Sequence, residues 1–208
     1  MPPGDLAGRV RARTEAAGLH VAPAALDRLV TYLDLLAFWN RRINLTAFDL
    51  ARPADEAIDR LLVEPVAAAP LVRPADRLAI DLGSGGGSPA IPLAIASPAI
   101  EMTMVEVRAK KAAFLREAIR TLALHATVEA VRFEDVAPGR DHACDLVSFR
   151  AVRADRALWQ TVDRLLAHRG RVLWFGGAGH EVPPAYAPTA VIGTTTAVER
   201  GGPGKDQG

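Results

Sequence analysis

A glycine-rich segment at residues 81–89 carries the strongest chemical signal in the sequence. It reads Asp81-Leu-Gly-Ser-Gly-Gly-Gly-Ser-Pro89, with glycines at positions 83, 85, 86 and 87. Glycine has no side chain and tolerates positive φ, so a ligand can approach such a backbone closely. A helical pattern follows the segment, and the first turn of a helix adds backbone N–H groups without intrahelical partners. The segment predicts a nucleotide-binding loop, since a simple tight turn needs fewer glycines.

Glu106 supplies a second element of the same site, because it ends the next predicted strand. A carboxylate at that place can accept hydrogen bonds from both hydroxyls of a ribose. Two ligands stay open, a dinucleotide and S-adenosylmethionine. The dinucleotide pattern expects a third glycine where this chain has Ser88. The form Asp-x-Gly-x-Gly-x-Gly, headed by Asp81, therefore favours S-adenosylmethionine over NAD.

The elements that must position these residues alternate along the second part of the chain. Strand-like apolar runs are found at 78–82, 102–105, 128–131, 146–149 and 172–175. Helical patterns separate them at 89–96, 109–124 and 154–167, and a β-prone stretch at 189–198 predicts one late strand. Strands that alternate with helices predict an α/β fold, with a mostly parallel sheet and helices on both faces.

Residues 1–76 show helical patterns and no strand-like run. An apolar stripe from about Pro23 to Trp39 predicts a long helix, and Pro23 suits its first turn. A second helix is expected after Pro53. We predict three regions: an N-terminal helical extension at 1–76, a nucleotide-binding domain at 77–200 and a disordered glycine-rich tail at 201–208.

The composition of the 208-residue chain is that of a globular protein, with 50% hydrophobic and 24% charged residues. Its net charge of +1 gives no reason for the whole molecule to bind a polyanion, so any nucleic-acid surface must be local. Cys144 is the single cysteine, which excludes an internal disulfide. The histidines lack metal-ligand spacing. We expect a monomeric cytoplasmic protein without a metal or a membrane segment.

Four segments in a fixed order extend the signal beyond the glycine loop. They are Trp39-Asn-Arg-Arg-Ile-Asn-Leu-Thr46, Asp81 to Leu93, Glu106 with Lys110-Lys111 and Phe114-Leu-Arg116, and Asp145-Leu-Val with Arg150-Ala151. Together they resemble the bacterial glucose-inhibited division protein B (RsmG) family. These methyltransferases act on N7 of a guanine in small-subunit ribosomal RNA. The resemblance covers about residues 20–177.

The resemblance implies a class I (Rossmann-like) methyltransferase fold and S-adenosylmethionine as cofactor. The glycine loop would hold the methionine part of the cofactor, Glu106 its ribose, and the segment at 133–134 its adenine. The positions implied as cofactor contacts are Asp81, Gly83, Ser84, Gly85, Gly87, Ser88, Glu106, Phe133, Glu134 and Arg150. Arg150 is implied to contact either the cofactor or the RNA.

The partner would be ribosomal RNA or the small ribosomal subunit, and basic side chains would bind its phosphates. The candidate RNA contacts are Arg41, Arg42, Lys110, Lys111, Arg153 and Arg156. For most of them an ordinary solvated helix face is an equally open interpretation. Asn44 and Thr46 either close the substrate side of the pocket or end a helix. Trp39 either stacks on a base or, as we favour, packs the extension on the core.

Three positions depart from the family pattern. Leu61 stands in place of a histidine, Phe149 in place of a serine, and Gly176 in place of a lysine. All three positions belong to the substrate side rather than to the cofactor loop. They leave two alternatives open: a divergent relative that methylates another RNA or a small molecule, and a non-catalytic module that binds the cofactor.

Overall fold

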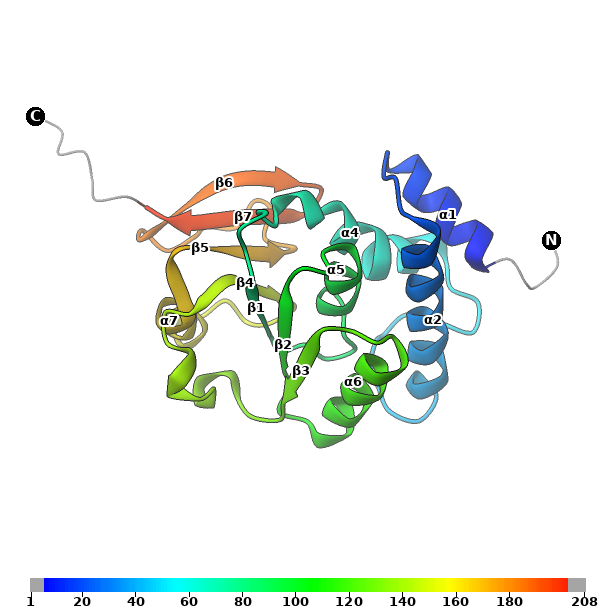
Figure 1. Ribbon diagram of the computed structural model, residues 1–208, viewed down its shortest axis with the longest axis horizontal. Helices are drawn as coiled ribbons and strands as arrows, with labels where there is room; N and C mark the ends of the chain where they lie inside the picture. The colour runs from blue at the N-terminus through cyan, green and yellow to red at the C-terminus, as the bar shows by residue number, and fades with distance from the viewer. Residues whose placement is uncertain (1–5, 202–208) are drawn as a thin grey trace, which may run out of the picture.

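A seven-stranded mixed sheet forms the centre of the protein (Figure 1). The structure is a computed structural model and describes residues 6–201. In spatial order the strands are β3 (Ala126–Glu129), β2 (Glu101–Val105), β1 (Leu78–Leu82), β4 (Cys144–Arg150), β5 (Leu166–Phe175), β7 (Thr195–Arg200) and β6 (Tyr186–Ile192). The first five are parallel, and β7 is antiparallel to both of its neighbours. This is the predicted α/β class.

The strand order reverses between β1 and β4. From β1 the chain adds β2 and β3 on one side, then crosses back to add β4 and β5 on the other. Consecutive connections therefore diverge at the carboxyl ends of β1 and β4. Ligands of open α/β sheets bind in the crevice at such a point.

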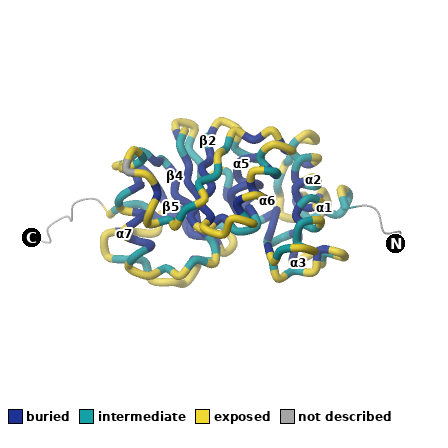
Figure 2. The backbone as a smooth tube through the Cα atoms, turned by 90° about the horizontal axis from the view of Figure 1, so that it is seen from below, coloured by how far each residue is buried: buried dark blue, intermediate teal, exposed yellow. Residues whose placement is uncertain are grey.

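Helices cover both faces of the sheet (Figures 1 and 2). The helix α7 (Arg156–Leu165) lies on one face, and α5 (Ala90–Ala96) and α6 (Ala109–Thr121) lie on the other. The N-terminal helices add an outer layer on the second face: α1 (Leu6–Ala16), α2 (Pro23–Asn40), α3 (Asp55–Ile58) and α4 (Glu64–Ala67). A π-helical turn, η1 (Asp59–Val63), joins α3 to α4, and short 3-10 turns lie at Ala69–Leu71, Phe133–Asp135 and Pro138–Arg140.

Alternation along the strands divides the core into two apolar clusters. In β5, Val172 and Trp174 belong to the cluster beneath α7, whereas Leu173 and Phe175 belong to the cluster beneath α5 and α6. This is the period of two that a strand buried on both faces requires. Phe149 belongs to the α7 side, where its ring lies 5.9 Å from that of Trp159.

The predicted elements are all present, but several boundaries differ, most of all that of β5, which begins at Leu166 rather than at 172. The late strand expected at 189–198 is wrong, because the chain turns at Gly193 and forms the hairpin of β6 and β7. Gly193 has a φ of +57°, which suits a tight hairpin turn. The third strand is Ala126–Glu129 rather than 128–131, and α7 ends at Leu165, directly before β5.

The N-terminal region is helical, as predicted, and packs on the sheet domain. The ring of Trp39 meets Phe114 of α6 edge-on at 5.9 Å, which confirms the packing interpretation of this residue. Cys144 is buried, as expected. The tail predicted to be disordered lies outside the described residues, apart from Gly201. Between residues 6 and 201 no helix is long and apolar enough to cross a bilayer.

Candidate functional site

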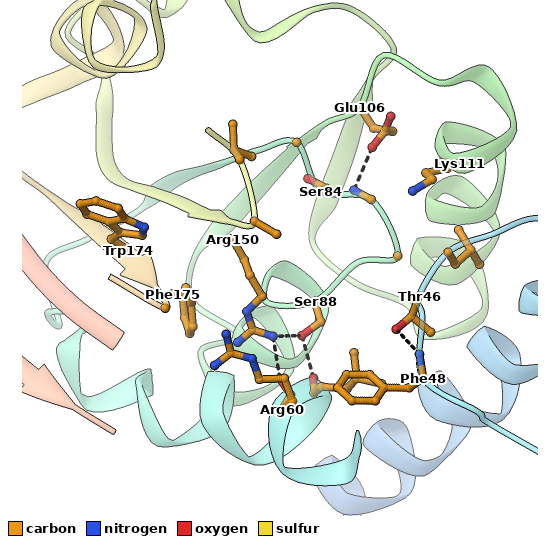
Figure 3. A pocket seen from close by; sticks show the side chains of 18 of the residues that line it. Thr46, Phe48, Arg60, Ser84, Ser88, Glu106, Lys111, Arg150, Trp174 and Phe175 are labelled. Atoms are coloured by element: carbon orange, nitrogen blue, oxygen red, sulfur yellow. Dashed lines mark hydrogen bonds between the residues drawn. The ribbon is translucent and has the colours of Figure 1, made fainter. Parts of the chain in front are cut away.

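A cavity of about 1150 Å³ opens at the carboxyl ends of the central strands (Figure 3). Its walls come from the glycine loop, from Glu106 after β2, and from residues 150–152 after β4. The end of β5 with Gly176, residues 179–181 and parts of the N-terminal region complete it. The cavity lies where the strand order reverses, so the extension and the sheet domain build it together.

The glycines of the loop have different roles. Gly83, Gly85 and Gly87 have φ values of +75°, +54° and +88°, a region that side chains rarely adopt. A Cβ at Gly83 would lie 2.7 Å from Val152, and one at Gly87 would lie 2.5 Å from Ile91. A Cβ at Gly85 would meet nothing closer than 3.7 Å, and Gly85 lines the cavity. Gly85 is therefore the glycine that leaves room for a ligand.

The Glu106 carboxylate is fixed at the edge of the cavity. Its Oε2 accepts a hydrogen bond from the Gly85 N–H at 2.9 Å, and its Oε1 accepts one from the Arg108 N–H at 2.8 Å. Each carboxylate oxygen keeps a further lone pair for another donor. The structure thus brings Glu106 and the glycine loop together, in an arrangement that suits a ribose.

Asp81 lies beneath the loop rather than in the cavity. Its side chain is 1% exposed, and its Oδ1 accepts a hydrogen bond from the Ser148 hydroxyl at 2.6 Å. The Ser84 hydroxyl donates to the Asp81 backbone carbonyl at 3.0 Å. Burial raises the pKa of the Asp81 carboxyl to about 6. The surroundings of Asp81 favour a role in supporting the loop over direct contact with a ligand.

The other predicted cofactor residues divide between the cavity and its surroundings. Ser84 and Ser88 line the cavity, whereas Gly87 packs against Ile91. Phe133 packs against the α7-side core, and the carbonyl of Glu134 accepts a hydrogen bond from Arg164. Phe133 and Glu134 are not among the residues that line the cavity, so their adenine role stays a prediction.

Arg150 lines the cavity, but its guanidinium is mostly committed to the protein. Nη2 donates to Glu64 Oε2 at 2.6 Å, and Nη1 donates to the Arg60 carbonyl at 2.6 Å and to Ser88 Oγ at 3.0 Å. The group lies 5.0 Å above the ring of Phe175. Burial lowers the pKa of Arg150 to about 10, so the side chain stays cationic at neutral pH. These contacts indicate that Arg150 positions Ser88.

The π-helical turn explains why these donors are needed. Pro65 has no N–H, so the carbonyl of Leu61 lacks its i+4 donor and that of Arg60 lacks its i+5 donor. The Ser88 hydroxyl donates to the Leu61 carbonyl at 2.8 Å, and Arg150 donates to that of Arg60. The glycine loop and β4 are thereby tied to the N-terminal extension.

Asn44 and Thr46, both predicted on the substrate side, differ in their position relative to the cavity. Asn44 is absent from the cavity lining within the described chain, whereas Thr46 lines it. Asn40 holds this loop, because its Oδ1 accepts hydrogen bonds from the N–H groups of Leu45 and Thr46 at 2.9 and 3.0 Å. Thr46 Oγ1 also accepts one from the Phe48 N–H at 3.3 Å. Thr46 does not end a helix, because α2 ends at Asn40, and its role on the substrate side of the pocket stays a prediction.

The predicted RNA contacts come from several different elements, and their role stays a prediction. Lys111 lines the cavity. The guanidinium groups of Arg41 and Arg42 lie 5.2 and 4.7 Å from the exposed ring of Phe38. Arg153 is exposed and 4.0 Å from Asp155. Of the remaining two, Lys110 lies in the first turn of α6, and Arg156 is the first residue of α7.

Several cavity residues had no role assigned from the sequence. They are Phe48, Arg60, Trp174, Phe175, His180 and Glu181. The rings of Trp174 and His180 lie 5.3 Å apart. The spacing of Arg60 and Glu64 at i and i+4 is the only local signal for this group, because the other residues meet through the fold. Over residues 6–201 no three His, Cys, Asp or Glu side chains are arranged to hold a metal ion.

The three departures from the family pattern fall in different places. Leu61 and Gly176 line the cavity, but Phe149 lies in the core on the α7 side. The expectation that all three change the substrate side is therefore wrong for Phe149. A Cβ at Gly176 would lie 3.2 Å from Arg60 Nη2.

Comparison with known proteins gives one consistent family. The model of the GidB family, rRNA small subunit methyltransferase G, matches residues 25–186. Ribosomal RNA small subunit methyltransferase G of Acidiphilium cryptum is 40% identical over 176 residues, covering 85% of this chain and 78% of the relative. The protein of that name in Neisseria meningitidis serogroup C is 36% identical over 154 residues, covering 73% and 71%.

Solved structures agree on the fold. The structure of MtNAS in complex with MTA and tNA has a TM-score of 0.54 at 14% identity, covering 86% of this chain and 76% of that one. At this identity the likeness concerns the fold alone. The mixed sheet is that of class I methyltransferases, as predicted. From the family model and the relatives, we conclude that the chain belongs to the GidB family of rRNA small subunit methyltransferases.

Proposed function

We propose that this protein transfers a methyl group from S-adenosylmethionine to N7 of a guanine in small-subunit ribosomal RNA. One observation carries the proposal: a single cavity joins the glycine loop and Glu106 to a wall of basic and aromatic side chains (Figure 3). The first part suits a nucleoside cofactor and the second suits a base on an RNA strand. Family membership supports the same substrate class.

The chain's own residues fit S-adenosylmethionine. The open side of Gly85 offers a cradle that a Cβ would fill, and the Glu106 carboxylate has acceptor capacity left for the two ribose hydroxyls. The buried carboxyl of Asp81 lies under the same loop, where a cationic ligand would favour its ionised form. When bound, the cofactor supplies an electrophilic methyl group on a sulfonium sulfur.

Guanine N7 has an in-plane lone pair at neutral pH, so its attack needs no general base. The work of the protein is to hold the base and the cofactor in line at a short distance. Phe48 is partly exposed in the cavity and offers a flat apolar surface on which a base can stack, whereas the Phe175 ring is buried beneath Arg150. Arg150 keeps Ser88 and the π-helical turn in place between the two halves of the cavity. We further propose that the protein acts as a monomer in the cytoplasm.

The direct test is methyl transfer from labelled S-adenosylmethionine to small-subunit particles and to naked ribosomal RNA. Both substrates come from a strain that lacks the endogenous enzyme, and mass spectrometry identifies the modified base. We expect N7-methylguanosine at one site. Cofactor binding without transfer to either RNA would contradict the proposed substrate.

A second candidate is a related methyltransferase with another RNA or a small molecule as substrate. The observation that favours it is the pair of departures, Leu61 and Gly176, which both line the cavity. Transfer to a different RNA in the same assay would support it.

A further inference from the structure

Arg60 lies where the large cavity meets a smaller groove. It lines both the main cavity and a neighbouring space of about 400 Å³ bounded by Glu56, Gly193 and Thr194. Its side chain is 37% exposed. In Figure 3 it lies beside Arg150 and Phe175, across the cavity from Glu106 and Lys111. This is a rim position, open both to solvent and to a molecule that enters the cavity.

A network of hydrogen bonds fixes one end of the Arg60 guanidinium. Nη1 donates to both carboxylate oxygens of Glu64 at 3.0 Å and to Thr194 Oγ1 at 2.8 Å. The Thr194 hydroxyl donates in turn to Glu64. Nη2 has no hydrogen bond to any residue in the described part of the chain. The side chain is thus held in place, yet keeps a donor group for another molecule.

The charges of this network do not balance. Glu64 is shared by Arg60 and Arg150, and one carboxylate cannot neutralise two guanidinium groups. The Arg150 side chain is 11% exposed, and both of its Nη atoms donate within the protein. Arg60 is the more exposed of the two, so it presents the excess positive charge to the rim.

Gly176 provides the space in front of Arg60. A Cβ at this position would lie 3.2 Å from Nη2, so the guanidinium would have to shift by a few tenths of an ångström. Gly176 also lines the cavity. Its missing side chain leaves the free face of the guanidinium accessible. Two further acids border the smaller groove: both carboxylate oxygens of Asp59 accept hydrogen bonds from Arg13, and Glu56 forms no salt bridge with Arg60.

We propose that Arg60 is a phosphate-binding residue that holds the RNA backbone where the strand enters the cavity. The proposal rests on the proposed function, since it takes RNA as the substrate. A guanidinium matches the geometry of phosphate oxygens, and its planar group is always charged. Because Glu64 and Thr194 already orient the group, binding a phosphate orders few additional side-chain torsions.

The test is the salt dependence of RNA binding, measured by fluorescence anisotropy with labelled small-subunit ribosomal RNA and with short polyuridine. Each phosphate contact on a single strand contributes about 0.7 to the slope of log K against log salt. This slope is negative, and we expect Arg60→Gln to reduce its magnitude by about 0.7. The Kd for S-adenosylmethionine should stay within about twofold of the wild type. An unchanged slope would overturn the proposal.

Arg73→Gln is the matched control, because Arg73 is 39% exposed, is ion-paired with Glu199 and precedes the amino end of β1, away from the cavity. It should keep the slope of the wild type, and an equal loss would overturn the proposal. Arg60→Lys should also keep the slope, because it retains the charge. If Arg60→Lys reduced the magnitude of the salt slope as Arg60→Gln does, this would count against a contact that depends on charge alone.

Gly176→Asp tests the same site without removing Arg60. It places a carboxylate next to Nη2, and aspartate tolerates the φ of +84° better than most residues. It should lower the slope as Arg60→Gln does, even if Arg60→Gln fails to fold. A wild-type slope in Gly176→Asp would contradict the proposal. If the wild type neither binds nor methylates ribosomal RNA, the proposed function itself fails. If the wild type methylates RNA but the wild type and Arg60→Gln have the same salt slope, only the role of Arg60 is refuted.

Discussion

Gly85 and Gly87 share a positive φ, but only Gly85 faces open space. We predict that Gly85→Asp weakens S-adenosylmethionine binding at least about a hundredfold, because a charged side chain fills the cradle beside the Glu106 carboxylate. Isothermal titration calorimetry measures the Kd. The control is Gly18→Asp, at a φ of +71° with no atom within 4 Å of its Cβ and outside the main cavity. An unchanged affinity in Gly85→Asp would refute the assignment of the loop.

Asp81 makes stability depend on pH. Burial raises the pKa of its carboxyl to about 6, against about 3.9 in an unfolded chain. The folded state therefore binds the Asp81 proton more tightly. The resulting stability is fully present below about pH 4 and is lost as the pH rises through 6. A shift of this size corresponds to about 3 kcal/mol.

The measurement is the free energy of unfolding in urea from pH 4 to pH 8 for the wild type and for Asp81→Asn. We expect the wild type to lose about 2–3 kcal/mol relative to the variant over this range. The asparagine cannot ionise, and its carbonyl can still accept the hydrogen bond of Ser148. A difference that does not change with pH would contradict the prediction.

Arg150 stabilises the fold through Glu64, whose side chain is 12% exposed. Removing Arg150 leaves the Arg60 carbonyl without its donor and leaves Glu64 with Arg60 as its remaining cationic partner. We predict that Arg150→Ala lowers the free energy of unfolding by about 3 kcal/mol. Arg60 keeps part of the compensation, so the loss should lie at the low end for buried pairs. The control is Arg120→Ala, because Arg120 and Glu117 form an exposed pair worth below about 1 kcal/mol. Equal losses in both variants would contradict the role of Arg150.

At the scale of elements, the π-helical turn depends on a donor from the glycine loop. Pro65 leaves the Leu61 carbonyl without its helical partner, and Ser88 Oγ supplies the hydrogen bond at 2.8 Å. We predict that Ser88→Ala destabilises the protein by about 1–2 kcal/mol. Urea unfolding measures the effect. Ser97→Ala, at the end of α5, should change the stability by less than about 0.5 kcal/mol. A Ser88→Ala variant as stable as the wild type would show that the turn satisfies its carbonyls in another way.

Features within one element can be predicted from the sequence, whereas contacts between distant elements cannot. The loop at 81–89 and Glu106 are local signals, because the residue types and the adjacent strands fix their place. The strand periodicity likewise predicts the parallel part of the sheet. Arg60 and Thr194 are 134 positions apart, and only the antiparallel hairpin of β6 and β7 brings them together. The hairpin was predicted as one strand, so no sequence argument could place Thr194 beside Glu64.

The partners of charged side chains are likewise not predictable from the local sequence. The family resemblance implies that Arg150 contacts the cofactor or the RNA. The local sequence contains no sign of Glu64, which comes from a helix 86 positions earlier and engages the guanidinium. Long basic side chains reach partners that their neighbours in sequence do not reveal. For this reason the predicted RNA contacts at Arg41 and Arg153 stay predictions.

At the scale of the whole molecule, the extension and the sheet domain share one core. The apolar cluster beneath α5 and α6 includes Leu29 and Leu36 of α2 together with Ile91 of α5. Tyr32 of α2 is fully buried, and its hydroxyl donates to the Gly86 carbonyl at 2.7 Å. The extension therefore contributes to the stability of the glycine loop as well as to the substrate side of the cavity.

This shared core predicts that residues 77–208 do not fold by themselves. Without the extension, the apolar face of α5 is exposed to water and the Gly86 carbonyl loses its partner. We expect the fragment to be insoluble or to lack a cooperative thermal transition. The complete chain should unfold in one step, with coincident circular dichroism and tryptophan fluorescence. A fragment that unfolds cooperatively and binds S-adenosylmethionine would instead show that the boundary at 76 and 77 separates two independent domains. In that case the cradle for the cofactor would be complete without the extension, which would then serve the RNA alone.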